Sequence, residues 1–144
     1  SGRVRALRGG RACNVMRGFF DVTPELLQGV AGVYDRAALI ALPPALRTRY
    51  AGHSAAILPA ATATLLVTME YAQNEMNGPP FAVREEEVRR LYEKRSTVTC
   101  LFTKDILAES PRFRERGVHA LVEKVYRLAL RPVQRGCGYP PADP

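Results

Sequence analysis

Long apolar stretches are absent from this sequence of 144 residues. No stretch approaches the ~20 consecutive apolar residues that a membrane-spanning helix needs, and the arginine-rich start lacks the apolar segment of a secretory signal. We therefore expect a cytoplasmic protein with no membrane partner. At 47% hydrophobic residues, the chain is long enough for one domain with a hydrophobic core and too short for two.

Cysteine and histidine are also sparse. The three cysteines have no metal-ligand spacing, and Cys100 lies in a strand-like run where we expect a small core residue. His53 and His119 are far apart and have no neighbouring serine or cysteine in a nucleophile motif. We expect reduced thiols, no metal site and no catalytic triad, and the sequence identifies no catalytic residue.

Lysine is scarce although the chain is basic. The formal charge is +7 at pH 7, but only Lys94, Lys104 and Lys124 among the 21 basic residues are lysines. Arginines cluster near the start, a pattern that suggests nucleic-acid binding. No recognition helix, aromatic RNA-binding strand motif or zinc finger accompanies them, so we expect no nucleic-acid partner.

The two ends differ in composition from the middle of the chain. Residues 1–10 are basic and contain glycine, and residues 132–144 are rich in proline and glycine, so both are predicted to be flexible. The predicted domain is residues 11–131. The run Arg8-Gly9-Gly10-Arg11 follows no predicted strand and opens no helix, so we interpret it as part of the N-terminal segment rather than a phosphate loop.

Between the ends, strand patterns alternate with helix patterns, which predicts the α/β class with a mainly parallel sheet. A helix is expected after Pro43-Pro44, because proline tolerates the first helical turn. Another is expected at 85–92, where acids in the first turn and the i,i+4 pairs Glu85 with Arg89 and Glu86 with Arg90 indicate a solvated helix face. The predicted strands are 12–20, 30–34, 62–71, 97–102 and 121–130.

An acid and an arginine, Asp35-Arg36, end the strand at 30–34. Ligands of open α/β sheets bind outside the carboxyl ends of the strands. If the strands that end near Tyr34, Tyr71 and Phe102 are parallel, the loops that follow them share one edge of the sheet. Those loops carry Arg36, then Pro79, Pro80 and Phe81, and finally Arg112.

Four short sequence phrases carry a family resemblance that covers roughly positions 10 to 130. They are the run from Tyr34 to Pro44, Gly78-Pro79-Pro80-Phe81, Glu109-Ser110-Pro111-Arg112-Phe113, and Glu123-Lys124-Val125-Tyr126-Arg127-Leu128. In order and spacing they resemble the bacterial type of the thiopurine S-methyltransferase family. The chain is similar to the C-terminal portion of that family and lacks its N-terminal donor-binding motif. The resemblance implies an incomplete doubly wound, Rossmann-like class I methyltransferase sheet with an antiparallel last strand.

The resemblance also implies an activity, namely methyl transfer from S-adenosylmethionine to the sulfur of a small aromatic or heterocyclic thiol. Selenium or tellurium compounds are further possible acceptors. Such a displacement needs alignment of the reactants rather than a protein nucleophile. Because the donor motif has no counterpart, we expect this chain to be weakly active or inactive alone. The alternative is a non-catalytic remnant or interaction module.

The resemblance assigns roles to particular residues. Gly18 and Phe19 match a segment beside the adenine of the donor, although Arg17-Gly18 replaces the Gly-Asp pair usual in bacterial members. Arg36 matches an arginine near both donor and acceptor, and Arg112 matches one at the acceptor pocket. Pro79, Pro80 and Phe81 complete the expected substrate-binding set.

Structural alternatives exist for each of these residues. Asp35-Arg36 is alternatively a local ion pair, Arg112 a solvent-exposed residue, Pro79-Pro80 only a rigid turn, and Phe81 a core residue. In the family the first two strands lie beside the strand matching 30–34. Without them we expect that strand to form an exposed sheet edge through which the chain self-associates.

Overall fold

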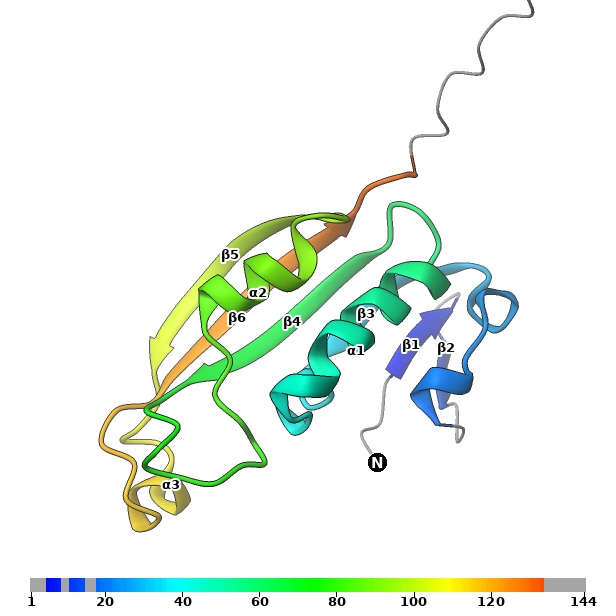
Figure 1. Cartoon of the computed structure of the whole chain (residues 1–144). Coiled ribbons are helices and arrows are strands. Elements are labelled where there is room, and N and C mark those ends of the chain that lie inside the picture. The colour runs from blue at the N-terminus through cyan, green and yellow to red at the C-terminus, as the bar shows by residue number, and fades with distance from the viewer. Residues whose placement is uncertain (1–4, 9–10, 15–17, 134–144) are drawn as a thin grey trace, which may run out of the picture.

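The computed structural model describes residues 5–8, 11–14 and 18–133 (Figure 1). Most of the predicted C-terminal segment, residues 134–144, lies outside these ranges. The strands are β1 (Arg5–Arg8), β2 (Arg11–Asn14), β3 (Val30–Asp35), β4 (Ala63–Glu70), β5 (Ser96–Asp105) and β6 (Val122–Leu130). The α-helices are α1 (Pro44–Ile57), α2 (Glu85–Tyr92) and α3 (Pro111–Glu115), and the 3-10 helices are η1 (Phe19–Asp21), η2 (Pro24–Leu27) and η3 (Leu39–Ala41).

In the described part of the chain, six strands form one mixed sheet in the order β2-β1-β3-β4-β6-β5. The α/β class is therefore confirmed, but the sheet is not mainly parallel, because β3 with β4 is the one parallel pair in these ranges. The last strand, β6, lies between β4 and β5 and is antiparallel to both, as predicted. Consequently β3, β4 and β5 all run in the same direction, although β5 does not touch the other two.

The N-terminal part of the sheet differs from the sequence prediction. Of the strand expected at 12–20, residues 12–14 lie in β2 and Phe19–Asp21 form a 3-10 helix instead, while residues 15–17 lie outside the described ranges. Arg5–Arg8, in the segment predicted to be flexible, form β1. This strand pairs with β3 in antiparallel fashion, so the prediction that β3 is an exposed edge is wrong. An unpaired edge leaves backbone donors and acceptors open, and the local hairpin satisfies those of β3.

Both longer helices cover the same face of the sheet (Figure 1). Proline at the first turn starts α1 where the sequence predicts it. Between these helices and the strands lies the main core, in which Leu39, Leu66 and Tyr126 are fully buried. No helix among the described residues is long and apolar enough to span a bilayer.

Candidate functional site at the carboxyl edge of the sheet

The carboxylate of Asp35, the last residue of β3, is buried and accepts three hydrogen bonds. Its Oδ1 accepts bonds from the backbone N–H groups of Ala38 (3.0 Å) and Leu39 (3.3 Å), and its Oδ2 accepts one from the Tyr50 hydroxyl (2.8 Å). Burial raises the pKa of the Asp35 carboxyl, and the hydrogen bonds from Tyr50 and the two amides oppose that rise. Asp35 therefore organises the turn into η3.

Arg36 is exposed next to this buried acid. In the described part of the chain no ion pair joins it to Asp35, so the alternative of a local pair is not what the geometry shows. The backbone turn held by Asp35 presents the Arg36 side chain to solvent at the end of β3. A guanidinium in this position is available to an anionic ligand.

The segment Gly18-Phe19 lies against α1. The Phe19 ring packs on Tyr50, with 4.5 Å between ring centroids, and on His53 at 5.2 Å. Since Tyr50 also holds Asp35, one side chain connects two segments predicted to bind the donor. Phe19 is half-buried and packs against the core, and its carbonyl accepts a hydrogen bond from the Val22 N–H (3.2 Å).

The loop between β4 and α2, residues 71–84, carries the Gly-Pro-Pro-Phe phrase and is fastened on two sides. The Pro80 carbonyl accepts a 2.6 Å bond from the Tyr71 hydroxyl, and the Phe81 N–H donates a 2.7 Å bond to the carbonyl of Ile40 in η3. The Gln73 amide bridges the loop, donating to the Met76 carbonyl and accepting from the Ala82 N–H. The loop is thus a rigid turn, and it also contacts η3, the segment that follows Arg36.

Phe81 occupies the centre of this contact. A Cβ added to Gly78 would lie 2.4 Å from its ring, so the ring covers Gly78 closely. The guanidinium carbon of Arg47 lies 5.8 Å from the ring centroid. Arg47, 2% exposed, donates to the Leu42 carbonyl and to Glu87, and its Nη2 has no partner. Half-buried Phe81 therefore has contacts typical of both a core residue and a pocket wall.

Arg112 lies exposed on α3, after β5. Its neighbour Phe113 packs edge-on against Tyr71, with ring centroids 6.3 Å apart. Arg116 donates a 2.8 Å bond to the Asn77 carbonyl, just before Gly78. These contacts fasten the α3 connection to the β4–α2 loop, and Figure 1 shows both below the carboxyl ends of β4 and β5.

The carboxyl edge therefore unites three predicted site segments through the β4–α2 loop. The loop contacts η3, which follows Arg36, and the connection that carries Arg112. Arg36 and Arg112 themselves are not in contact through any hydrogen bond in the part of the chain that is described. Sequence reasoning missed Tyr50, Tyr71 and Gln73, which position these segments. The signals that could have pointed to the tyrosines were the position of Tyr71 at the end of a predicted strand and that of Tyr50 inside a predicted helix.

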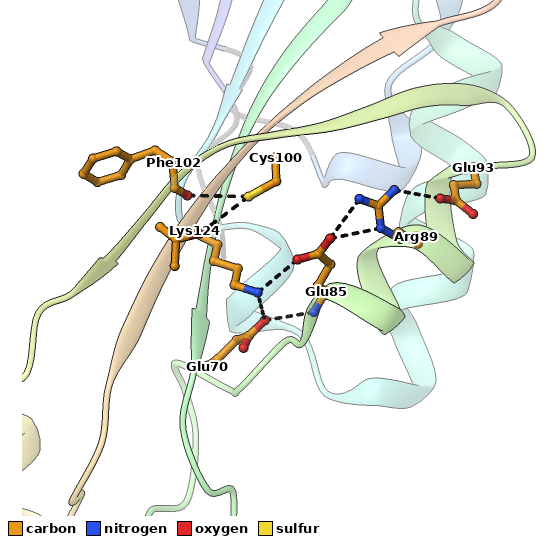
Figure 2. A network of polar contacts seen from close by, with 8 residues as sticks. Glu70, Glu85, Arg89, Glu93, Cys100, Phe102 and Lys124 are labelled. Carbon is orange, nitrogen blue, oxygen red and sulfur yellow. Dashed lines mark hydrogen bonds and ion pairs between the residues drawn. The ribbon is translucent and has the colours of Figure 1, made fainter.

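A second, highly charged region lies on the helix side of the sheet. A cavity of about 520 Å³ there includes none of the predicted site residues. On its wall the Lys124 ammonium contacts Glu85 at 3.0 Å and Glu70 at 3.2 Å (Figure 2). Lys124, and then Arg89, hold the pKa of Glu85 below its ordinary value, and Glu85 in turn raises that of Lys124.

The charges of α2 are thus more than a solvated face. The predicted pair of Glu85 with Arg89 is confirmed at 2.8 Å. The predicted pair of Glu86 with Arg90 does not form, because Arg90 contacts Glu87 instead, at 3.5 Å. Glu85 and Glu87 both make ion pairs to other elements, which residue spacing alone does not reveal. In the described ranges no group of three or more side chains is suited to hold a metal ion.

Comparison with known proteins resolves the family. The thiopurine S-methyltransferase family model matches residues 6–131. The chain belongs to this family. Its match begins inside the segment that forms β1, so the N-terminal hairpin falls largely within the family region.

Curated thiopurine S-methyltransferases are similar to most of this chain. That of Nitrosospira multiformis is 48% identical over 113 residues, which cover 78% of this chain and 51% of the relative. That of Pseudomonas paraeruginosa is 52% identical over 110 residues, with 76% and 50% covered. That of Bordetella petrii is 46% identical over 109 residues, with 76% and 50% covered. The chain spans about half the length of these relatives.

The described residues do not by themselves fit a nucleoside sulfonium donor. No loop with a Gly-x-Gly pattern follows β3 or β4, and the ring of Phe19 packs against Tyr50 and His53. Of the residues that the resemblance assigns to the donor, Arg36 is the one whose side chain is exposed at the carboxyl edge.

Proposed function

We propose that this chain carries the acceptor-binding side of an S-adenosylmethionine-dependent S-methyltransferase. The single observation that supports this is the fastening of the β4–α2 loop to both η3 and the α3 connection. It gathers Arg36, the Pro79-Pro80-Phe81 turn and Arg112 at the carboxyl edge, where open α/β sheets bind ligands. The names of the relatives point to the same activity.

The proposed acceptors are small aromatic or heterocyclic thiols. Phe81 offers a ring against which a flat acceptor packs, and two exposed guanidinium groups favour the ionised thiolate. The planar fork of arginine also donates to ring nitrogen atoms, which an ammonium does less selectively. Selenium and tellurium compounds remain further proposed acceptors. A cytoplasmic location, which keeps thiols reduced, suits such substrates.

Donor binding is the second part of the proposed function. Because the described residues supply no glycine loop, we propose that the 144-residue chain is weakly active or inactive by itself. Titration of S-adenosylhomocysteine into the folded chain tests this part. If the titration of the folded chain releases no heat, the chain alone does not bind the donor, as proposed. Binding at micromolar strength overturns this part of the proposal.

Acceptor binding is tested by titration of 6-mercaptopurine into wild type and two α3 variants. Both Arg112 and Arg114 are exposed on α3, so Arg114→Ala removes the same charge from the same helix and serves as a matched control. We expect Arg112→Ala to weaken binding by about tenfold, as for loss of a charge-assisted hydrogen bond, and Arg114→Ala to change it little. Equal affinities of the two variants, or no binding by the folded wild type, overturn the acceptor site.

An interaction module is the second candidate function. The observation that favours it is a set of exposed apolar side chains on the sheet face away from α1 and α2, among them Leu65 and Phe102. This function does not require any ligand at the carboxyl edge. The two candidates are separable, because a thiol titration and a measurement of self-association report on different surfaces.

A further inference from the structure

A small hydrophobic cluster at the carboxyl edge, here called the edge core, lies apart from the main core. Its buried members are Tyr71, Met76, Val118 and Leu121. The first two belong to the β4–α2 loop, and the other two belong to the connection between β5 and β6, residues 106–121. Phe113 of the same connection packs against them. The edge core therefore joins the segment that carries the Pro79-Pro80-Phe81 turn to the segment that carries Arg112.

Polar contacts on the surface join the same two segments. The Glu75 carboxylate accepts a 3.1 Å bond from the His119 N–H and lies 2.9 Å from Nδ1 of the His119 ring. Together with the bond from Arg116 to the Asn77 carbonyl, these contacts are exposed to solvent. Water competes for exposed bonds, so their contribution is small. The stronger link between the two segments lies in the edge core.

The Pro79-Pro80-Phe81 turn is poor in backbone donors. Proline has no N–H group, so residues 79 and 80 cannot donate a backbone hydrogen bond. After them, the Phe81 N–H donates to the Ile40 carbonyl. The proline pair itself is held through an acceptor, the Pro80 carbonyl, which the hydroxyl of buried Tyr71 contacts at 2.6 Å. Because this bond is partly buried, its loss costs more than the loss of a surface bond.

Gln73 fixes the direction of the bond from Tyr71. The Gln73 Nε2 donates to the Tyr71 hydroxyl oxygen at 3.1 Å and to the Met76 carbonyl at 2.8 Å. Its Oε1 accepts a 2.9 Å bond from the Ala82 N–H. Both hydrogens of the amide are thereby used. The hydroxyl oxygen of Tyr71 accepts one of them, so its own hydrogen is directed to the Pro80 carbonyl.

One side chain thus reaches both halves of the proposed acceptor site. The Tyr71 ring packs edge-on against Phe113, the neighbour of Arg112, while its hydroxyl holds Pro80. We propose that Tyr71 is a positioning residue of this site and makes the Pro79-Pro80-Phe81 turn and the α3 connection move as one body. An acceptor packed on the turn then meets Arg112 in a fixed geometry. The role in acceptor binding rests on the proposed function, whereas the fixing of the turn concerns contacts within this chain.

Amide hydrogen exchange of the full chain, followed by NMR, tests the fixing of the turn. Tyr71→Phe keeps the ring against Phe113 and removes only the hydroxyl. We expect the Phe81 and Ala82 amides to exchange at least about fivefold faster in this variant, as for loss of one hydrogen bond. The Val118 amide donates to the Phe113 carbonyl at 3.1 Å and should keep its wild-type rate. Tyr71→Leu also removes the ring, so the Val118 amide should then exchange faster as well.

Tyr126→Phe is the matched control. The Tyr126 hydroxyl is buried and has no hydrogen-bond partner within the described ranges, so its removal should leave the exchange of the loop amides unchanged. Gln73→Ala is a second test, because exposed Gln73 can be replaced without a change in either core. It should release the Ala82 amide and, through Tyr71, the Phe81 amide. Unchanged exchange of Phe81 in folded Tyr71→Phe overturns the inference; if that variant does not fold, unchanged exchange of Phe81 in Gln73→Ala does so.

Titration of 6-mercaptopurine tests the role in acceptor binding. We expect folded Tyr71→Phe to bind this thiol about fivefold more weakly than Tyr126→Phe, since the turn no longer holds Phe81 in place. Equal affinities of the two variants, with the Phe81 amide released, overturn the role of Tyr71 in acceptor positioning. No binding by the folded wild type overturns the proposed function instead, and the exchange rates still decide whether Tyr71 holds the turn.

Discussion

The Tyr50 hydroxyl in the middle of α1 donates a 2.8 Å hydrogen bond to the buried carboxylate of Asp35 at the end of β3. The same carboxylate accepts two backbone bonds that start η3. One acidic side chain therefore sets the position of the turn that presents Arg36. Burial, together with the charge of Asp35, raises the pKa of Tyr50 well above its ordinary value, so this phenol stays a donor.

Loss of the Tyr50 hydroxyl is expected to destabilise the fold. Tyr50→Phe leaves one side of a buried carboxylate without its donor, which should lower the free energy of unfolding by about 2 kcal/mol. Asp35→Asn removes the charge but keeps an acceptor for the two amides, and its cost should be smaller. Urea titrations measure both. The double variant should lose less stability than the sum of the two single-variant losses, because both substitutions act on one hydrogen bond. A loss equal to that sum would contradict the coupling.

The ion pair of Arg47 with Glu87 gives an asymmetric prediction. Arg47 is 2% exposed, whereas Glu87 is 20% exposed. Glu87→Ala leaves a buried guanidinium uncompensated and should cost about 2 to 3 kcal/mol, while Arg47→Met leaves a carboxylate that water still reaches and should cost less. Thermal unfolding of the two variants compares them, with Glu86→Ala at an exposed neighbouring position as control. A larger cost for Arg47→Met would show that guanidinium packing, not charge, dominates.

Two glycines provide a matched pair of substitutions. At Gly78 an added Cβ would lie 2.4 Å from the Phe81 ring, whereas at Gly52 in α1 nothing lies within 4 Å. Gly78→Ala should displace Phe81, cost about 1 to 3 kcal/mol and weaken 6-mercaptopurine binding. Gly52→Ala should stabilise α1 by up to about 1 kcal/mol and leave binding unchanged. Unchanged stability of Gly78→Ala would indicate that the loop is looser than its hydrogen bonds imply.

Acid should weaken the contact between β6 and the start of α2. The pKa of Glu85 is lowered in the folded chain, first by Lys124 and then by Arg89. Its contribution to stability is therefore complete above the ordinary pKa of a glutamate and is lost as the pH falls through the lower folded value. Lys124→Met should be less stable than wild type at neutral pH, and the difference should shrink as the pH falls below the ordinary pKa of a glutamate. Urea unfolding at several pH values measures this, and exposed Lys94→Met should show no such trend.

Local signals account for the parts of the fold that the sequence predicts well. The proline at the start of α1, the apolar run of β4 and the acids at the start of α2 each act within a few residues. Expectations that depend on distant partners fared worse. The pairing of β1 with β3 and the shift of register between Cys100 and Phe102 in β5 are set by neighbouring strands, and no local pattern encodes them.

The candidate site shows the same division. The four phrases direct attention to Arg36, the Gly-Pro-Pro-Phe loop and Arg112, and the fold places them at one edge. The residues that hold them there pair across the sequence: Tyr50 reaches Asp35 over 15 positions, and Arg116 reaches Asn77 over 39. Spacing rules describe neighbours on one helix or strand, so such contacts become visible only in three dimensions.

The position of β6 between β4 and β5 has a consequence for synthesis of the chain. Both β4 and β5 form most of their ladders with β6, which follows both of them in the chain and therefore leaves the ribosome after them. Until residues 122–130 have been made, β5 has no partner and β4 has one edge open, which exposes aggregation-prone strands. A premature stop before Val122 should therefore send the product to inclusion bodies or proteolysis rather than yield a shorter folded protein.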